Sequence, residues 1–210
     1  MTVRRALVTV SLLGLAACAS PPDLSQPVEP IGDFRMGHNI VVARDTTMGP
    51  LSREATEAEL EAEIRAAIEE RLRRYDGDGL YHVGVRVEAY ILAQPGIPIV
   101  LSPRSVLLLA LNIWDNETQE RINEEPIRIT AFEGANTGVP LVPSGLMKSK
   151  EEQLRNLSIS AALEIEQLLQ ENAETWFAPK PGRERVEFAP GETAPPEAAV
   201  PEAPASPTDA

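Results

Sequence analysis

The chain contains two histidines, His38 and His82, and one cysteine, Cys18. These side chains are among those that most often hold zinc, and each can also act in acid–base or nucleophilic catalysis. Both histidines lie in segments where polar and apolar residues alternate, as they do in a half-buried strand. A metal site would need carboxylates from elsewhere, although strand pairing could bring the two histidines together. Because polar strand positions more often face solvent or a partner, we expect no metal site and no cofactor.

The stretch "DGDGL", Asp76 to Leu80, begins like an EF-hand calcium loop, with carboxylates at alternate positions. The match then ends, because Leu80 occupies the third ligand position and Val87 stands where the closing glutamate belongs. A glycine-rich helix stop followed by the start of a strand explains the same residues. The chain also lacks the motifs of serine hydrolases, P-loop proteins, zinc proteases and dinucleotide-binding proteins. We therefore expect no catalytic residue and no enzyme, with a carboxylate-based cell-wall hydrolase as a third hypothesis, since such chemistry needs no local motif.

The amino terminus reads as a secretory signal. Arg4 and Arg5 precede "ALVTVSLLGLA", an apolar run that is too short to span a bilayer as a helix, which takes about 20 residues. The following residues, "LAAC" from Leu15 to Cys18, resemble the lipobox of bacterial lipoproteins. The resemblance implies that the thiol of Cys18 receives a diacylglycerol and that cleavage removes residues 1–17. The alternative is an ordinary signal peptide cut at an A-x-A-like site.

The lipobox resemblance also implies a location. An aspartate directly after the cysteine commonly retains a lipoprotein at the inner membrane, and here that position is Ala19. We therefore expect a lipid anchor in the periplasmic leaflet of the outer membrane, held by about 0.8 kcal/mol for each buried methylene of the acyl chains. A single cysteine also rules out a disulfide within the chain.

The chain is acidic, with a formal net charge of -13. Loss of a signal peptide that carries Arg4 and Arg5 would make the charge about -15. The densest basic stretch, "RLRRY" from Arg71 to Tyr75, is interleaved with glutamates on a predicted helix, so we expect no nucleic-acid partner. Three pairs have the favourable i, i+4 spacing for ion pairs along that helix: Glu61 with Arg65, Glu69 with Arg73, and Glu70 with Arg74.

Composition divides the chain into four parts. Residues 1–17 form the predicted signal peptide, and residues 18–30 form the lipidated cysteine with a proline-rich tether. Residues 31–177 have the length and apolar content of a single domain. Residues 178–210 are dominated by Pro, Ala and Glu, and we expect this tail to be disordered.

Hydrophobic periodicity predicts the elements of the domain. Period-two alternation predicts strands near residues 34–42 and 80–89, and the wholly apolar stretch at 106–111 predicts a central strand covered on both faces. The turn "WDNETQE" predicts a hairpin into a further strand, where Pro126 favours an edge or a bulge. Capping boxes at Thr56/Glu59 and Ser149/Glu152 open two predicted helices, which reach about residue 75 and about residue 177.

These elements predict an α+β fold in the order β-α-β-β-β-α, with a small mixed or mainly antiparallel sheet of four strands and two helices packed on one face. The arrangement loosely resembles the periplasmic domains of the curli-secretion lipoprotein, the penicillin-binding-protein activator lipoprotein and the amino-terminal domain of TolB. More closely, the segments "GHNIVVA", "PGIP", "LSPRS" and "WDNETQERIN" resemble landmarks of an α-proteobacterial lipoprotein family without an assigned function. The resemblance therefore implies no catalytic or binding residue.

One connection is unusually apolar for a loop, namely "QPGIPIVLSPRS" from Gln94 to Ser105. Its prolines oppose regular ladder bonding, so its apolar side chains either cover the core or form an exposed patch. We expect the protein to bind another envelope protein; the plainer interpretation of this connection is an arm that covers the core, and the sharper hypothesis is a docking surface made by Ile97, Ile99, Val100 and Leu101, with Arg104 at the rim. The alternative function is a carrier of a lipid-like ligand, held in a groove between sheet and helices, as an accessory subunit of an envelope transport system.

Overall fold

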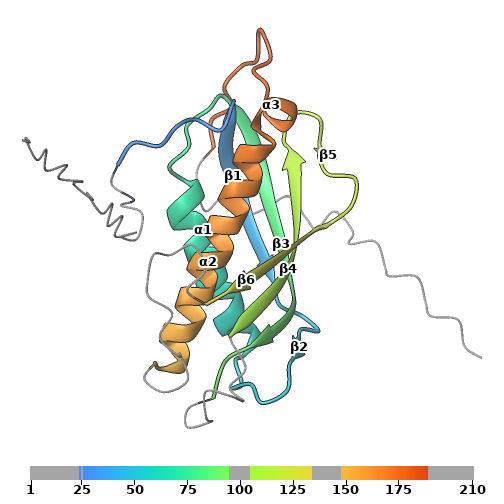
Figure 1. Ribbon diagram of the computed structural model, residues 1–210. Helices are drawn as coiled ribbons and strands as arrows, with labels where there is room; N and C mark the ends of the chain where they lie inside the picture. The colour runs from blue at the N-terminus through green and yellow to red at the C-terminus, as the bar shows by residue number, and fades with distance from the viewer. Residues whose placement is uncertain (1–23, 25, 95–104, 134–147, 189–210) are drawn as a thin grey trace, which may run out of the picture.

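The computed structural model describes residue 24 and residues 26–94, 105–133 and 148–188. Its sheet has four main strands in the order β1 (Phe34–Val42), β3 (Gly79–Ile91), β4 (Val106–Asp115) and β6 (Ile127–Phe132) (Figure 1). β1 is parallel to β3, and the other two pairings are antiparallel. Two short strands, β2 (Thr47–Met48) and β5 (Glu120–Arg121), extend the sheet beside β3 and β4. The predicted mixed sheet is confirmed.

Two long helices follow strands that run in the same direction. α1 (Glu57–Leu72) connects β1 to β3, and α2 (Lys150–Glu171) comes after β6 in the chain. Both predicted capping boxes are present, because Thr56 and Ser149 each accept a hydrogen bond from the backbone N–H of the glutamate three residues later, whose carboxylate bonds back to the cap. A short helix, α3 (Ala173–Trp176), ends the helical layer.

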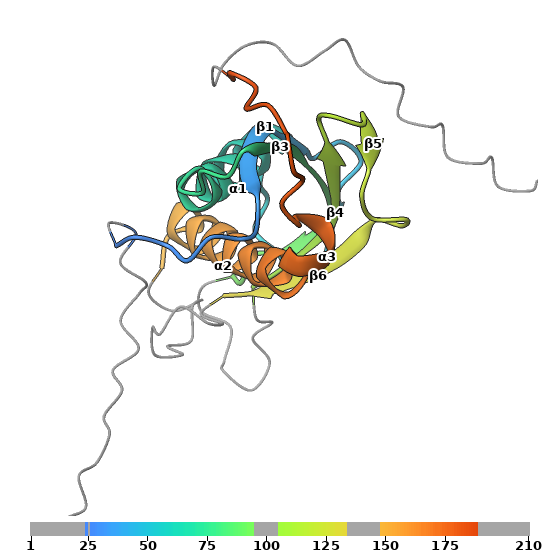
Figure 2. The ribbon, with the colours of Figure 1, turned by 90° about the horizontal axis from the view of Figure 1, so that it is seen from above.

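The two long helices lie side by side and parallel on one face of the sheet (Figure 2). Lys150 bonds Glu59 at the amino-terminal ends, at 2.6 Å, and Arg71 bonds Glu166 near the carboxyl-terminal ends, also at 2.6 Å. Helices and sheet enclose one core of buried side chains that includes Ile64, Ile68, Tyr81, Val85, Leu109, Leu111, Leu157 and Ile165. The predicted packing of two helices on one face is therefore confirmed.

A buried polar cluster joins the helices inside this layer. The side chains of Arg71 and Glu166 are only 6% and 11% exposed, and the hydroxyl of Tyr75 donates to the second oxygen of the Glu166 carboxylate at 2.7 Å. Burial, and then the hydrogen bond to Glu166, raise the pKa of Tyr75, so its hydroxyl stays protonated as the donor. Gln170 reaches the same hydroxyl at 3.4 Å. The cluster fixes the register of α1 against α2.

Side chains of α1 also bond the backbone of the strand β1 and its end. The carbonyl of Met36 accepts from Arg73, the carbonyl of Val41 accepts from Arg65, and the N–H of Ala43 donates to Glu61. Of the three predicted i, i+4 ion pairs on these described residues, only Glu69–Arg73 forms. Glu61 and Arg65 turn to the strand instead, where they satisfy backbone groups that would otherwise be open to another strand.

After α3, residues 178–188 cross the end of the sheet, and we call this segment the strap. Arg183, with a side chain 7% exposed, bonds Asp33 at 2.8 Å and Glu117 at 2.9 Å, and donates to the Tyr81 hydroxyl at 3.1 Å. Lys180 bonds Asp115 at 3.1 Å. The predicted domain boundary at residue 177 had left these eleven residues in the tail, whereas the structure describes them in contact with the domain; the rest of the predicted tail lies outside the described residues.

Candidate functional site

The face of the sheet opposite the helices carries apolar residues. On β4, inward-facing Leu107, Leu109 and Leu111 are fully buried under the helices. Outward-facing Val106 and Leu108 are half-buried, because both described long helices lie on the other side. The prediction that β4 is a central strand is confirmed, whereas the described helices do not provide the predicted cover on its second face. β4 therefore carries apolar residues on both faces, but the described helices cover only one of these faces.

Three large apolar side chains cluster on this face, and a fourth, Phe132 on β6, is 43% exposed beside Val106. Ile40 and Val42 on β1 are 44% and 37% exposed, and Trp114 on β4 is 40% exposed. Strand register places them close together, because Ile40 pairs with Gly84 on β3 and Trp114 pairs with His82, two residues earlier on β3. Exposed apolar residues that cluster in this way mark interaction surfaces more often than isolated ones do.

Gly84 places no side chain beside the tryptophan. A Cβ atom added at Gly84 would lie 3.9 Å from Nε1 of Trp114 and 3.8 Å from the carbonyl oxygen of Asn112, both of them ordinary contact distances. The residue therefore has no steric need to be glycine. Its effect is to leave bare backbone on this face between Ile40 on β1 and Asn112 on β4.

Arginines border the apolar residues. Arg86 lies between Val42 and Ala110 in one row across the sheet, and Arg128 continues that row on β6. Arg128 contacts Glu88 only at 3.6 Å, with its side chain 80% exposed. We define the open face as the surface formed by these residues and by Arg121, which pairs with Trp114: Ile40, Val42, Gly84, Arg86, Ala110, Trp114, Arg121 and Arg128. Tryptophan and arginine together are typical of the energetic centres of protein interfaces.

The two histidines meet at one end of the open face. Their ring centroids are 4.8 Å apart, and Nδ1 of His82 accepts the backbone N–H of His38 at 2.9 Å. Nε2 of His82 lies 3.0 Å from Oδ1 of Asn116, so it carries the proton and donates. Both ring nitrogens of His82 are thereby bonded to protein groups. Strand pairing does join the histidines, and what it builds is a hydrogen-bonded support for the bulge in β1.

This arrangement predicts a pH dependence of stability. Burial, the largest cause, and the neighbouring His38 lower the pKa of His82, outweighing the opposite effects of Asn116 and Asp115. Because the unfolded chain then binds the proton more readily, stability is full above the ordinary pKa of 6.5 and falls as the pH drops below it. Urea unfolding midpoints at about pH 7.5 and about pH 5.5 should therefore differ less in His82→Gln than in the unaltered protein. An equal decline in both proteins would contradict this prediction.

The strap ends at the same place. The ring of Phe188 packs edge-on against His38 at 4.9 Å and lies 5.9 Å from the guanidinium of Arg73. Just before it, the carbonyl of Val186 accepts from Arg35 at 2.6 Å. The described chain thus stops at the rim of the open face.

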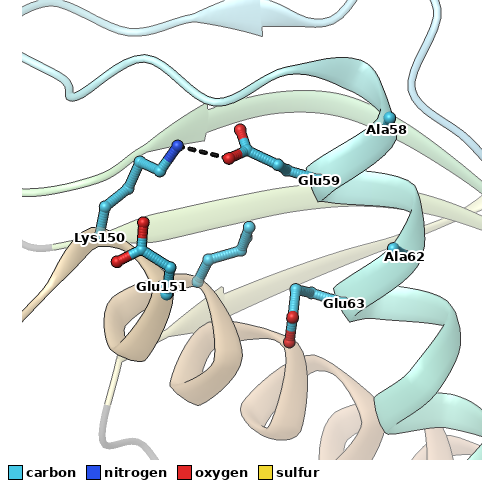
Figure 3. A pocket seen from close by; sticks show the side chains of 7 residues that line it. Ala58, Glu59, Ala62, Glu63, Lys150 and Glu151 are labelled. Atoms are coloured by element: carbon cyan, nitrogen blue, oxygen red, sulfur yellow. Dashed lines mark hydrogen bonds and ion pairs between the residues drawn. The ribbon is translucent and has the colours of Figure 1, made fainter.

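A groove lies on the helical side, between the first turns of α1 and α2 (Figure 3). Ala58, Ala62 and Leu154 line it, and Lys150 bonds Glu59 across it. The hydrogen bonds of Glu59 to Lys150 and to the N–H of Thr56 lower the pKa of Glu59. These charged groups are engaged in fastening and capping the helices, so we do not favour this groove as the site.

The site residues predicted from the sequence, Cys18, Ile97, Ile99, Val100, Leu101 and Arg104, lie outside the described residues, so their roles stay predictions. The base of the predicted docking loop is described. Its flanks are joined because Ser105 accepts the N–H of Ala93 at 3.2 Å. Next to this base, Met48 and Leu51 are 50% and 60% exposed. Leu51 has a φ of 56°, an unusual left-handed conformation for such a side chain.

Two kinds of feature are absent from the described ranges. Residues 24, 26–94, 105–133 and 148–188 contain no group of three or more His, Cys, Asp or Glu side chains arranged to hold a metal ion. Within the same ranges, no helix has both the length and the apolar composition needed to cross a membrane.

Comparison with known proteins gives distant likenesses only. No family model matches the sequence, and no curated protein matches it. Among solved structures, PelC of Paraburkholderia phytofirmans, solved as a dodecamer, is 9% identical over 66% of this chain and 92% of that chain, with a TM-score of 0.36. Protein XCC0632 from Xanthomonas campestris is 12% identical over 74% and 94%, with a TM-score of 0.39. A minor lipoprotein from Acinetobacter baumannii is 15% identical over 64% and 93%, with a TM-score of 0.29. At these values the likenesses carry no argument about function.

Sequence reasoning missed the open face. It covered Trp114 only as the first residue of the turn "WDNETQE" and Gly84 only as part of the strand expected near residues 80–89. The available signal was the alternation of Asn112 and Trp114 with inward-facing Leu111 and Ile113, which places the tryptophan outward. An outward tryptophan on a central strand stands on a broad sheet surface, where a partner can reach it.

Proposed function

We propose that this chain is a lipid-anchored protein of the bacterial envelope, at the periplasmic face of the outer membrane, that acts by binding another envelope protein through the open face rather than by catalysis. The observation that carries the proposal is the outward side of β4 and its neighbours, where Trp114, Ile40 and Val42 are 37–44% exposed on a sheet face that the described helices leave bare. The anchor is supported by the lipobox-like residues before Cys18.

The chemistry of the open face defines the partner. Burial of apolar surface provides the driving force, and the bare backbone at Gly84 lets a partner approach the sheet beside Trp114. Arg86 and Arg121 lie near this position, so the partner should present carboxylates around an apolar centre. Among the described residues, Arg86 contacts no carboxylate, which leaves its guanidinium free to bind one.

The alternative, a carrier for a lipid-like ligand, was expected to use a groove between sheet and helices. That layer is filled, because Val85, Leu109 and Leu111 from the sheet and Ile68 and Leu157 from the helices are at most 3% exposed. A lipid would have to displace core side chains to enter it, at a cost of several kcal/mol. The structure therefore favours docking at the surface over carriage in the interior.

Site-specific photo-crosslinking in living cells tests the proposal. A photoreactive phenylalanine in place of Val42 on the open face should form an adduct with one other envelope protein, whereas the same group in place of exposed Ala66 on α1 should not. Adding Gly84→Leu should reduce the adduct about tenfold or more, because the new side chain stands where the partner would approach the backbone. The thermal midpoint should change by less than about 2 °C, since the added Cβ meets its neighbours at ordinary contact distances and position 84 lies on the outward face.

Two results would contradict docking at the open face. One is an identical set of adducts from positions 42 and 66, which would indicate random encounters. The other is an adduct from position 42 that persists undiminished in Gly84→Leu while the variant remains folded.

A further inference from the structure

One segment of this same chain has the position, length and charge to bind the open face. We propose that residues 189–210 bind the open face of their own chain and compete there with the partner, an inference that rests on the proposed docking function. The tail would then act as an intramolecular pseudo-ligand that the partner must displace.

The first argument is the point at which the tail begins. Arg183 and Lys180 anchor the strap, and Phe188 fixes its end against the ring of His38. His38 bonds His82, which pairs with Trp114 on the next strand. The tail therefore starts at the rim of the open face, as a continuation of an intramolecular contact that is already formed.

The second argument is length. The tail comprises the 22 residues from 189 to 210, and proline-rich chain advances about 3.1 Å per residue, which gives a reach of about 70 Å. β4 has 10 residues, so the sheet is about 33 Å long in that direction. The tail can cross the whole open face and still bend.

The third argument is chemical complementarity. The tail contains Glu192, Glu197, Glu202 and Asp209 and no lysine or arginine, and the open face presents Arg86, Arg121 and Arg128. Six prolines, including the adjacent pair Pro195 and Pro196, give the tail the composition of a polyproline helix. Proline-rich segments in that conformation dock on exposed aromatic side chains, as offered here by Trp114.

Covalent attachment makes such a contact effective. A short flexible connection gives a local concentration in the millimolar range, so even a weak site is occupied in cis. The electrostatic part of the contact weakens as salt screens exposed charges over distances of about 10 Å or less.

The fluorescence of Trp114 provides a direct readout. In the lipid-anchored protein with Trp176→Phe, Trp114 is the remaining tryptophan. Ending this chain after Phe188 should raise the acrylamide quenching constant of Trp114 about twofold or more. A chain of unchanged length with Glu192→Gln, Glu197→Gln and Glu202→Gln should give an intermediate quenching constant. Added salt should also raise the quenching constant of the full-length chain. An unchanged quenching constant after truncation would overturn the proposal.

Two further outcomes separate the occupants. Protection of Trp114 that disappears on dilution would overturn binding in cis in favour of a second copy of the chain. Truncation should also increase the yield of the partner adduct from position 42, because the competitor is gone. If quenching is insensitive to truncation while the adduct persists, tail binding fails and partner docking stands. If truncation changes quenching but no partner adduct forms, docking of a partner fails and tail binding stands.

Discussion

Glu166→Ala is expected to lower the free energy of unfolding by about 3–5 kcal/mol, because it leaves the guanidinium of Arg71 buried without a counter-charge. The same change removes the acceptor of the Tyr75 hydroxyl, which keeps only the longer contact to Gln170. Urea unfolding followed by circular dichroism measures the loss. The site lies between two helices that the sheet holds parallel, so the helices cannot slide apart to hydrate the arginine without disturbing the core.

Two control variants use the same pair of helices. Lys150→Ala removes the exposed ion pair to Glu59 at the other end and should cost less than about 1 kcal/mol. The double variant Arg71→Met with Glu166→Leu removes both buried charges and should recover most of the stability lost in Glu166→Ala. A loss below about 1 kcal/mol for Glu166→Ala would show that water reaches Arg71 and that the cluster is not a buried ion pair.

Cys18→Ala is expected to abolish membrane attachment by lipid, since the lipobox resemblance makes the thiol of Cys18 the acceptor of the diacylglycerol and the cut site its amino side. The unaltered protein should incorporate labelled fatty acid, whereas the variant should not and should retain residues 1–17. Intact-mass measurement distinguishes the two forms. Labelling that survives in the variant would remove the basis for the lipid anchor.

Ala19→Asp serves as the matched variant for location. It leaves Cys18 in place, so the protein should still be labelled with fatty acid, but the lipoprotein should now sediment with the inner membrane. An unchanged distribution between the two membranes would contradict the proposed outer-membrane location without affecting the anchor itself.

Local patterns were sufficient to predict most of the fold. The capping boxes at Thr56 and Ser149 mark the starts of α1 and α2, since a cap is a contact between residues three positions apart. Alternation along β1 and β3 predicted their buried faces, because side chains of a strand point to opposite sides in turn. The element order then limited the packing to helices on one face of a small sheet.

Contacts between distant parts of the chain could not be predicted in the same way. The spacing of Glu61 and Arg65 suggested an ion pair along the helix, whereas both side chains bond the end of β1, which only the tertiary packing brings near. The same holds for Arg183, whose partner Asp33 lies 150 residues away. Composition alone assigned the strap to the tail, because the strap is rich in prolines and charged residues. Composition does not show that the fold buries one of these charged residues, Arg183.

The sequence predicted the candidate site less well than it predicted the fold. The sequence indicated that β4 is apolar on both sides, which is correct, but it could not show that the described helices cover one side only. The place of Gly84 between Ile40 and Asn112 on the open face depends on strand register. Register is a property of pairing between strands and has no local signature.

The strap determines where a pulling force on the chain would act on the domain. The N–H of Asp33 donates to the carbonyl of Phe177 at 2.7 Å, and the close approach needs the absence of a side chain at Gly32, whose φ is 52°. Together with the Asp33–Arg183 ion pair, this contact joins the described segment before β1 to the described segment after α3 at one pole of the domain (Figure 1). With the predicted lipid at Cys18, a pull between the membrane and the tail would load this contact together with the other attachments of the strap, among them those to Arg35 on β1 and Asp115 on β4. Such a pull would therefore act at one end of the sheet.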